Sequence, residues 1–250
     1  MAATLKLGDR QWATQEGSLL AYNDENNNFK PLPFDFTRAS SATRVNKQGL
    51  IETVASGVPR IDYTDANGAL LLEPQRSNLI TYSELFSDAS WTKSGSSVVS
   101  GFASPSADSP LGAFKLVEDT STGRHETQVP SSLSGDLAFS FFAKKGENSF
   151  IQITNGQDPS AYANFDLNLG VVGSSTVYTP TIIDYGNGWY RCIATINSAL
   201  SINYARIGLI TSSTSARVES YTGDGVSGVY IWGAQLEQGS YATSYIPTQG

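Results

Sequence analysis

The chain has 250 residues and a formal net charge of −7 at neutral pH, which argues against nucleic acid or an anionic membrane surface as a partner because both require a basic face. Its single cysteine, Cys192, and single histidine, His125, exclude an intrachain disulfide and a zinc site built from several such ligands. Aromatic residues make up 11% and charged residues only 16%, with 23 Gly and 10 Pro, so the composition favours β structure.

Residues 1–36 are predicted to form an extended arm. They begin without an apolar leader, and no run in the chain approaches the length of a membrane span, so we expect synthesis in a cytoplasm and no membrane insertion. Pro31 and Pro33 favour extended backbone, and the arm has too few apolar residues to fold alone. Such arms become ordered on another protein. Four side chains are candidate anchors for that contact: Trp12, Leu19, Leu20 and Tyr22.

The stretch FDFTRASSATRVNKQGLIE, residues 34–52, sets Arg38 and Arg44 among small side chains. It is predicted either as a short helix or as a strand, and in a strand the two arginines share one face. Small side chains allow close backbone approach while both guanidinium groups pair with carboxylates, on a partner or on this acidic chain. We therefore assign Arg38 and Arg44 to attachment. The alternative is a loop that lies against the chain's own domain.

Residues 37–74 are predicted to form a small β connector. The stretch VNKQGLIETV places a Gly-containing turn between apolar flanks, and RIDYTDANGALLLEP joins two apolar runs through Asn67-Gly68. Asp62 and Asp65 lie at this second turn but lack calcium-loop spacing. A solvated turn is therefore favoured over a structural Ca²⁺ site, and no cofactor or metal is expected.

Residues 75–250 consist of short apolar stretches separated by turn residues, which predicts an antiparallel β-sandwich of the jelly-roll type. Strand pairs are expected around the turns at residues 145–148 and 186–188, and further strands in YARIGLITS and GVYIWGAQLE. The clearest alternation is in ANFDLNLG, which places four residues on one face: Ala163, Phe165, Leu167 and Leu169.

Catalytic motifs are sparse, so we predict that the protein is not an enzyme. His125 lies in a polar stretch typical of the surface, without a serine in a nucleophile-elbow motif, and Cys192 alternates with apolar residues as a buried thiol does. The alternative is a glycan-degrading enzyme, which requires two carboxylates that meet in the fold. Six acids are candidates, although they form no sequence cluster: Glu84, Glu118, Glu126, Asp184, Glu219 and Glu237.

Aromatic residues suggest a carbohydrate site instead. In GWYRCIATI the apolar face holds Cys192 and its alternating neighbours, so Trp189 falls on the other face beside Arg191. An exposed indole there would stack on a sugar ring, whereas the alternative is that Trp189 is buried under a loop or between sheets. The candidate carbohydrate-binding residues are Trp189, Arg191, Tyr185 and Tyr162, with Tyr204 and Tyr221 as weaker candidates.

Four phrases in order, FDFTRASSATRVNKQGLIE, ALLLEPQRSNLITYSELFSDASWTKSG, GWYRCIATI and GVYIWGAQLEQGSYATSYIPT, resemble a module of tailed-bacteriophage structural proteins. This module occurs in fibre-like and decoration proteins of the head or tail, including those of crAss-like phages. The resemblance implies a concanavalin-A-like or carbohydrate-binding jelly roll displayed on the particle surface. It transfers no catalytic residue.

The expected function is therefore that of a non-enzymatic virion protein, a head fibre or capsid-decorating fibre, with a tail fibre or tail adaptor as the alternative. Residues 1–36 would hold capsid or tail proteins, and the jelly roll of residues 75–250 would bind host-surface glycans. Virion fibres present several identical copies, so a homodimer or homotrimer is expected. Its contacts are predicted at the rim of the GVYIWGAQLE strand and at the connector hairpin.

Overall fold

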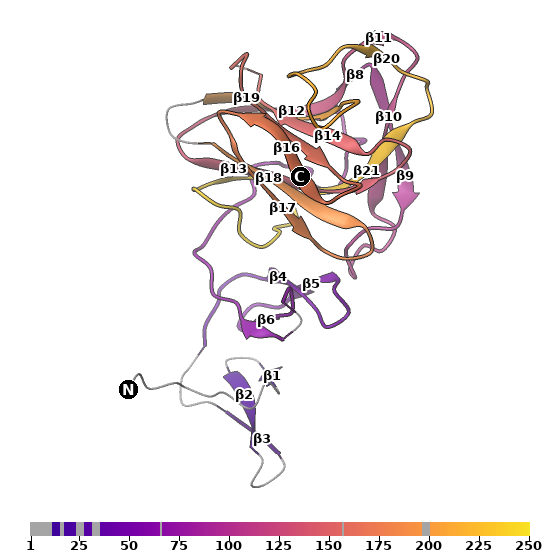
Figure 1. The fold of residues 1–250 in the computed structure, drawn as a ribbon. Coiled ribbons are helices and arrows are strands. Elements are labelled where there is room, and N and C mark those ends of the chain that lie inside the picture. The colour runs from indigo at the N-terminus through magenta and orange to yellow at the C-terminus, as the bar shows by residue number, and fades with distance from the viewer. Residues whose placement is uncertain are drawn as a thin grey trace. The chain divides into compact units, whose positions relative to one another are not determined.

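The computed structural model of this chain is all-β, with no helix among the residues that it describes (Figure 1). The chain divides into two compact units, Met1–Pro74 with Ser106–Asp108, and Gln75–Pro105 with Ser109–Gly250. The structure describes residues 12–15, 18–23, 28–31, 36–65, 67–156, 158–196 and 201–250. For the first three of these ranges and for Ser201 it gives the backbone alone.

The first unit begins with a three-stranded antiparallel meander in the order β1-β2-β3. Its strands are β1 (Trp12–Gln15), β2 (Ser18–Asn23) and β3 (Asn28–Pro31). Within the segment predicted as an extended arm, the described backbone is extended, and its three strands pair with one another. The four anchor candidates lie on β1 and β2, and their side chains are outside the described part: Trp12, Leu19, Leu20 and Tyr22.

Two hairpins follow in the first unit, as predicted for the connector. They are β4 (Ala42–Val45) with β5 (Ile51–Val54), and β6 (Ile61–Asp62) with β7 (Ala69–Leu70). In the turn of the first hairpin, the Asn46 side-chain oxygen accepts hydrogen bonds from the backbone N–H groups of Gln48 and Leu50, at 2.9 and 3.0 Å. The described part of residues 34–52 is therefore a strand and turn, and the helical alternative is wrong.

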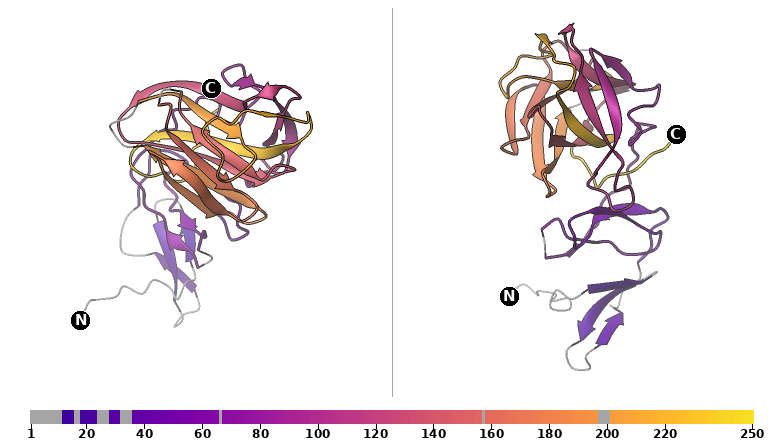
Figure 2. Two further views of the ribbon diagram at one scale, coloured as in Figure 1. Left: turned by 45° about the horizontal axis from the view of Figure 1, so that its top comes forward. Right: turned by 90° about the vertical axis from the view of Figure 1, so that its right-hand side faces the viewer.

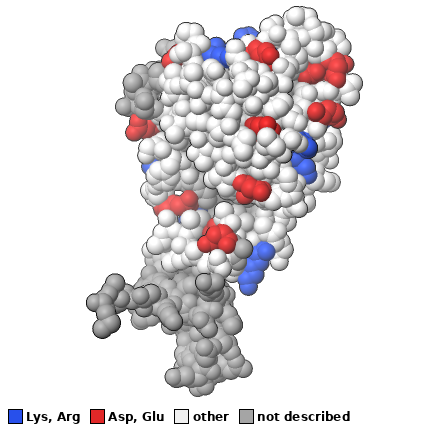
Figure 3. Space-filling model, viewed as in Figure 1, with Lys and Arg blue, Asp and Glu red and all other residues white. Residues whose placement is uncertain are grey.

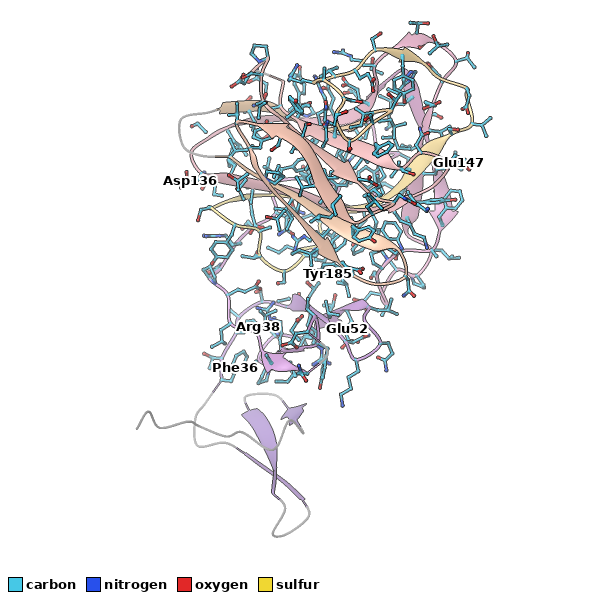
Figure 4. The ribbon with its side chains drawn as sticks, viewed as in Figure 1. Phe36, Arg38, Glu52, Asp136, Glu147 and Tyr185 are labelled. Carbon is cyan, nitrogen blue, oxygen red and sulfur yellow. The ribbon has the colours of Figure 1, made fainter. Side chains whose placement is uncertain are left out.

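The two arginines of this stretch contact the first unit itself. Arg44 lies opposite Glu52 across the hairpin, and its Nη2 is 2.7 Å from Glu52 Oε1, which is the carboxylate pairing that the sequence predicts. Arg38 instead donates to the backbone oxygens of Ala55 and Val58, at 2.7 and 2.9 Å. No carboxylate among the described residues pairs with Arg38, so its pairing with a carboxylate on a partner stays a prediction. Figure 4 labels Arg38 and Glu52 in this unit.

The second unit is a sandwich of two six-stranded antiparallel sheets, and the predicted fold class is confirmed (Figure 2). The β21 sheet has the order β17 (Thr179–Asp184), β18 (Trp189–Ile196), β13 (Leu137–Lys145), β21 (Gly228–Gln238), β10 (Ala113–Glu118) and β9 (Ser96–Phe102). The β19 sheet has the order β16 (Val171–Thr176), β15 (Tyr162–Asp166), β14 (Phe150–Thr154), β19 (Ser201–Leu209), β12 (His125–Ser134) and β8 (Thr92–Ser94). A ribbon of β11 (Thr122–Gly123) and β20 (Tyr221–Thr222) completes the unit.

The inner faces of the two sheets enclose one apolar core. Its aromatic side chains are Phe86, Trp91, Phe114, Phe139, Phe141, Phe165 and Tyr178. Cys192 lies among them fully buried, as the sequence predicts, and burial raises the pKa of its thiol, so the sulfur is an inert core group. The turn at residues 145–148 carries the chain from β13 in one sheet to β14 in the other.

One predicted core residue, Leu169, is 68% exposed, so its assignment to the apolar face of ANFDLNLG is wrong. The strand ends at Asp166, where Oδ1 accepts hydrogen bonds from the backbone N–H groups of Asn168 (2.8 Å) and Leu169 (3.0 Å). This side-chain turn ends the alternation after Leu167.

A bulge at Gly233 changes which side chains of β21 face the core. Before it Val229 and Ile231 point inward, and after it Ala234 and Leu236 do. Gly233 has a φ of +60°, in the left-handed region that favours glycine. Because β21 lies between β13 and β10 inside its sheet, the predicted subunit contact along the rim of GVYIWGAQLE is wrong: both edges of the strand are already paired.

Candidate functional site

The predicted aromatic site lies on the outer face of the β21 sheet, the face turned away from the core. Trp189 and Arg191 do lie opposite Cys192, but their exposed fractions are only 2% and 3%. Trp189 is therefore buried, the alternative that the sequence left open, and it presents no ring face for a sugar. Arg191 donates through Nη1 to the Thr243 carbonyl at 2.7 Å and through Nη2 to Ser140 Oγ at 3.0 Å.

Chain segments from both ends of the second unit bury this outer face, which we call the covered face. The Tyr245 ring lies 4.6 Å from that of Trp232, and Phe142 lies 5.3 Å from Trp232, as distances between ring centroids. The Tyr245 hydroxyl is 2.7 Å from Ser83 Oγ, while the Asn78 side chain donates to the backbone oxygen of Ala234 at 3.0 Å. The phrases around residues 78–83, 189–193 and 228–248 thus meet in one buried layer.

The outer face of the β19 sheet is different, because polar side chains form a row across it. Successive cross-strand pairs place five residues side by side: Thr92, Gln128, Arg206, Thr154 and Tyr162. Their sequence neighbours, such as Val129, Ile207 and Ile153, face the core. Strand alternation therefore points the row outward.

A second row lies two residues along the same strands. It consists of Ser94, Glu126, Gly208, Gln152 and Asn164, and we call the two sets together the polar rows. The loop of residues 211–219 is tied to one end of them: Gln152 Nε2 donates to the Ala216 carbonyl at 3.1 Å, and Asn164 Nδ2 donates to that of Ser215 at 2.8 Å. That end is structural, whereas Glu126, Gln128 and Arg206 lie at the other.

The charges of the polar rows are concentrated around Glu126. Its Oε1 lies 3.2 Å from Arg124 Nε and 3.4 Å from Arg206 Nε, and the residue is only 2% exposed. Burial raises the pKa of Glu126, against the opposing effect of Arg206, Arg124 and Arg217. Burial also lowers the pKa of Arg206, and repulsion from the other two arginines adds to this. On the side of the molecule seen in Figure 3, acidic and basic side chains are scattered among uncharged ones.

One tyrosine lies beside Arg206, and a second ends the first row two strands away. Tyr204 is half-buried, with its ring centroid 5.9 Å from Arg206 Cζ, and its ring packs on the backbone of Gly156. Tyr162, a predicted carbohydrate residue, ends the first row and is also half-buried. The structure therefore separates the four predicted residues, because Tyr185 contacts Phe142 on the covered face at 4.9 Å between ring centroids.

Sequence reasoning missed Gln128 and Arg206 and considered Glu126 only as a catalytic acid. The stretch HETQ is polar at all four positions and gives no alternation, so the available signal was Arg206 between apolar neighbours in YARIGLI. Gln128 and Arg206 are 78 positions apart, with Arg206 Nε donating to Gln128 Oε1 at 2.9 Å. The sequence does not reveal this pairing.

The six candidate acids are held by separate groups of neighbours. Tyr221 donates to Glu118 at 2.7 Å, Thr211 to Glu219 at 2.9 Å, and Thr243 to Glu237 at 2.7 Å. Asp184 accepts the backbone N–H of Gly186 at 2.7 Å, and Glu84 accepts the Tyr245 hydroxyl at 3.1 Å. Only Glu126 of these acids belongs to the polar rows, so the rows contain one carboxylate rather than a pair.

His125, expected at the surface, is only 1% exposed, and this expectation is wrong. Its Nδ1 lies 2.5 Å from the Gly95 carbonyl and its Nε2 lies 3.1 Å from that of Tyr221, so the imidazole joins β12 to the β11–β20 ribbon. A separate hollow of about 440 Å³ is lined by the apolar side chains of Leu85, Leu111 and Phe114 and by polar residues that include Glu84 and Gln249. The carboxylate of Glu84 accepts a hydrogen bond from the Tyr245 hydroxyl, so the polar rows remain the stronger candidate for a functional site.

Within the described ranges, no three His, Cys, Asp or Glu side chains gather as ligands for a metal ion. The same residues contain no helix long and apolar enough to span a membrane. Comparison with protein-family models and with curated proteins found no match to this chain.

Proposed function

We propose that this chain is a non-enzymatic structural protein of a bacteriophage virion, a head fibre or capsid-decorating fibre, whose β-sandwich binds glycans on the host surface. The observation that carries the glycan-binding part is the set of polar rows on one outer face of the sandwich, while the other outer face is covered by the chain itself. The virion part rests on the resemblance of four ordered phrases to phage structural proteins.

The polar rows have the chemistry that sugar recognition requires. Sugars present hydroxyl groups that both donate and accept, together with a flat C–H face. Gln128 and Arg206 supply an amide and a guanidinium group, with the half-buried ring of Tyr204 beside Arg206 and that of Tyr162 at the end of the same row. Each of these side chains stands on a β-strand, which holds it in a fixed position relative to the others.

A binding role is favoured over hydrolysis because the rows contain one carboxylate. Glycosidases of the usual kind require a second acid about 5–9 Å from the first. Here Glu126 lies between Arg124 and Arg206. That arrangement suits a carboxylate that orients the guanidinium groups of the two arginines.

The glycan-binding part is tested by screening the full chain against a panel of oligosaccharides. Gln128→Ala and Tyr204→Ala should each weaken binding about tenfold, the loss expected for one hydrogen bond or one stacked ring. The matched control is Tyr241→Ala, because Tyr241 is 48% exposed and its ring contacts Arg76, apart from the polar rows. Absence of binding to any glycan would overturn this part.

The virion part is tested separately on purified particles. The chain should be detected in intact virions by mass spectrometry, and deletion of residues 1–33 should leave a folded β protein that no longer incorporates. Normal occupancy of the truncated protein would contradict attachment through this segment. Density located on the tail rather than the head would favour the tail-fibre alternative.

A further inference from the structure

We infer that the ligand of the polar rows is an acidic saccharide, whose oxyanion is bound by the guanidinium group of Arg206 with Arg124 and Arg217 beside it. The inference rests on the proposed glycan-binding function and adds the class of glycan. The shared chemistry is a carboxylate, sulfate or phosphate carried on a sugar.

The first support is an excess of positive charge in an acidic chain. The whole chain carries −7, yet three arginines act with Glu126 at the polar rows, and Asp158 beside Arg217 is a further carboxylate that acts on them. Arg124 and Arg217 both disfavour the charged form of Arg206, because like charges repel in a partly desolvated place. A bound oxyanion would relieve this repulsion.

The second support is that part of the hydrogen-bonding capacity of Arg206, its two Nη groups, is left unused among the described residues. Its Nε faces Gln128 Oε1 at 2.9 Å and Glu126 Oε1 at 3.4 Å. No described residue accepts a hydrogen bond from its two Nη atoms, and neither of them is sealed from solvent. The two Nη groups of a guanidinium match the paired oxygens of a carboxylate, sulfate or phosphate.

The third support is the placement of the neighbouring arginines. Arg124 Nε contacts Glu126, and the Arg124 side chain is 49% exposed, so it is accessible to a ligand. Arg217 donates through Nη2 to the Asn155 carbonyl at 2.7 Å and through Nε to that of Ala161 at 3.3 Å, which fixes its position. Gly208 adds no side chain between Glu126 and Gln152 in the second row.

Glu126 gives the inference a test in which two substitutions have opposite effects. As an anion it repels a ligand oxyanion and attracts Arg206 toward itself. Glu126→Gln should therefore tighten binding of an acidic saccharide severalfold, whereas Arg206→Gln should weaken it about tenfold or more, the loss expected for a charge-assisted hydrogen bond. If the arginines and Glu126 formed only a structural ion pair, neither change would alter the preference for acidic over neutral sugars.

The experiment measures binding of the full chain to matched saccharides. Trigalacturonate is compared with its methyl ester, and sulfated and phosphorylated oligosaccharides are compared with their unmodified forms. The acidic forms should bind about tenfold tighter or more, with an advantage that shrinks as salt is raised. The charge-matched control is Lys47→Gln, on an exposed residue of the first unit, which should bind as the wild type does. Arg124→Gln serves as the second variant if Arg206→Gln does not fold.

The outcomes separate the two proposals. Binding of neutral and acidic sugars with equal affinity, insensitive to salt, would overturn the acidic ligand and leave the glycan-binding function standing. Binding of no saccharide would overturn the glycan-binding function itself. Preference for sulfated and phosphorylated sugars over trigalacturonate would support the oxyanion and identify its source.

Discussion

The two outer faces of the sandwich both carry an arginine that is less than a tenth exposed, and the two arginines are used differently. On the covered face both Nη atoms of Arg191 donate to the protein, and its guanidinium lies 5.4 Å from the Phe142 ring centroid. On the polar rows Arg206 engages its neighbours through Nε alone. Burial of an arginine is therefore no guide to its role. The two arginines differ in their Nη groups, which Arg191 uses within the described part of the protein and Arg206 does not.

The difference arises from what covers each sheet. The covered face receives the segments around Ser83 and Tyr245, which bring their own aromatic ring and hydroxyl groups. The polar rows receive only the 211–219 loop, which is tied to Gln152 and Asn164 at one end. The covered face acts as a second core. At the other end of the polar rows Arg124 is exposed and Gln128 half-buried, while Glu126 and Arg206 themselves are buried.

The largest expected effect concerns the aromatic layer of the covered face. Trp232→Ala should reduce the free energy of unfolding by about 3–5 kcal/mol, since Trp232 is 1% exposed and packs on Tyr245 and Phe142. Urea denaturation measures this loss, with Tyr241→Ala as the exposed control. A loss below about 1 kcal/mol would mean that the covered face is not a second core.

The second prediction compares the two arginines directly. Arg191→Gln should cost about 2–3 kcal/mol of unfolding free energy, because the Thr243 carbonyl and Ser140 Oγ lose their donor in a buried place. Its glycan affinity should equal that of the wild type at a temperature where the variant is folded. Loss of glycan binding without loss of stability would reverse the roles assigned to the two faces.

A smaller effect is expected from removing one hydroxyl group of the covered face. Tyr245→Phe keeps the ring and removes the group that contacts Ser83 Oγ and Glu84, so we expect a loss of about 1–2 kcal/mol. Burial raises the pKa of the Tyr245 phenol well above its ordinary value, so the wild-type group is neutral and this loss should be the same from about pH 6 to about pH 9. A loss that varies over this range would show that another group titrates there.

The smallest effect is a pH dependence at the polar rows. Glu126 faces Arg206 on β19, Arg124 beside its own strand and Arg217 in the 211–219 loop, yet burial keeps its pKa above the ordinary value. An acid with a raised folded pKa contributes stability that is complete below about pH 4.3 and is lost as pH rises through the folded pKa. The stability of the wild type relative to Glu126→Gln should therefore fall as pH rises above about 4.3.

Urea denaturation of both proteins across this range measures the difference. A relative stability that increases with pH would mean that the arginines outweigh burial and that the pKa of Glu126 is lowered instead.

The sandwich was predictable because its evidence is local. Alternation in GWYRCIATI placed Trp189 opposite Cys192 correctly, and the turn at residues 186–188 placed the hairpin. The burial of Trp189 was not predictable, since a period-two pattern shows that two faces differ and says nothing of what a distant segment adds to the second one. The cover of that face comes from residues around Ser83 and Tyr245, outside the hairpin.

The polar rows depend on strand order, which the sequence does not contain. Gln128, Arg206 and Thr154 become neighbours only because β19 lies between β12 and β14. By contrast, the end of β15 was within reach of sequence reasoning. An aspartate two residues before an asparagine, as in Asp166–Asn168, is a common turn signal, and it would have excluded Leu169 from the strand.

Gly233 determines how insertions and deletions would affect β21. Deletion of Gly233 would remove the bulge and leave Ala234 and Leu236 facing the core. Straightening of the strand with all its residues kept would instead exchange the faces of every side chain that follows. Gln235 and Glu237, both fully buried and hydrogen-bonded on the covered face, would be directed into the apolar core. A substitution fares little better, because a Cβ on Gly233 would approach Phe142 to 3.1 Å and Tyr245 to 3.2 Å. We therefore expect homologous chains either to keep a glycine at this bulge or to lose the bulge together with that one residue.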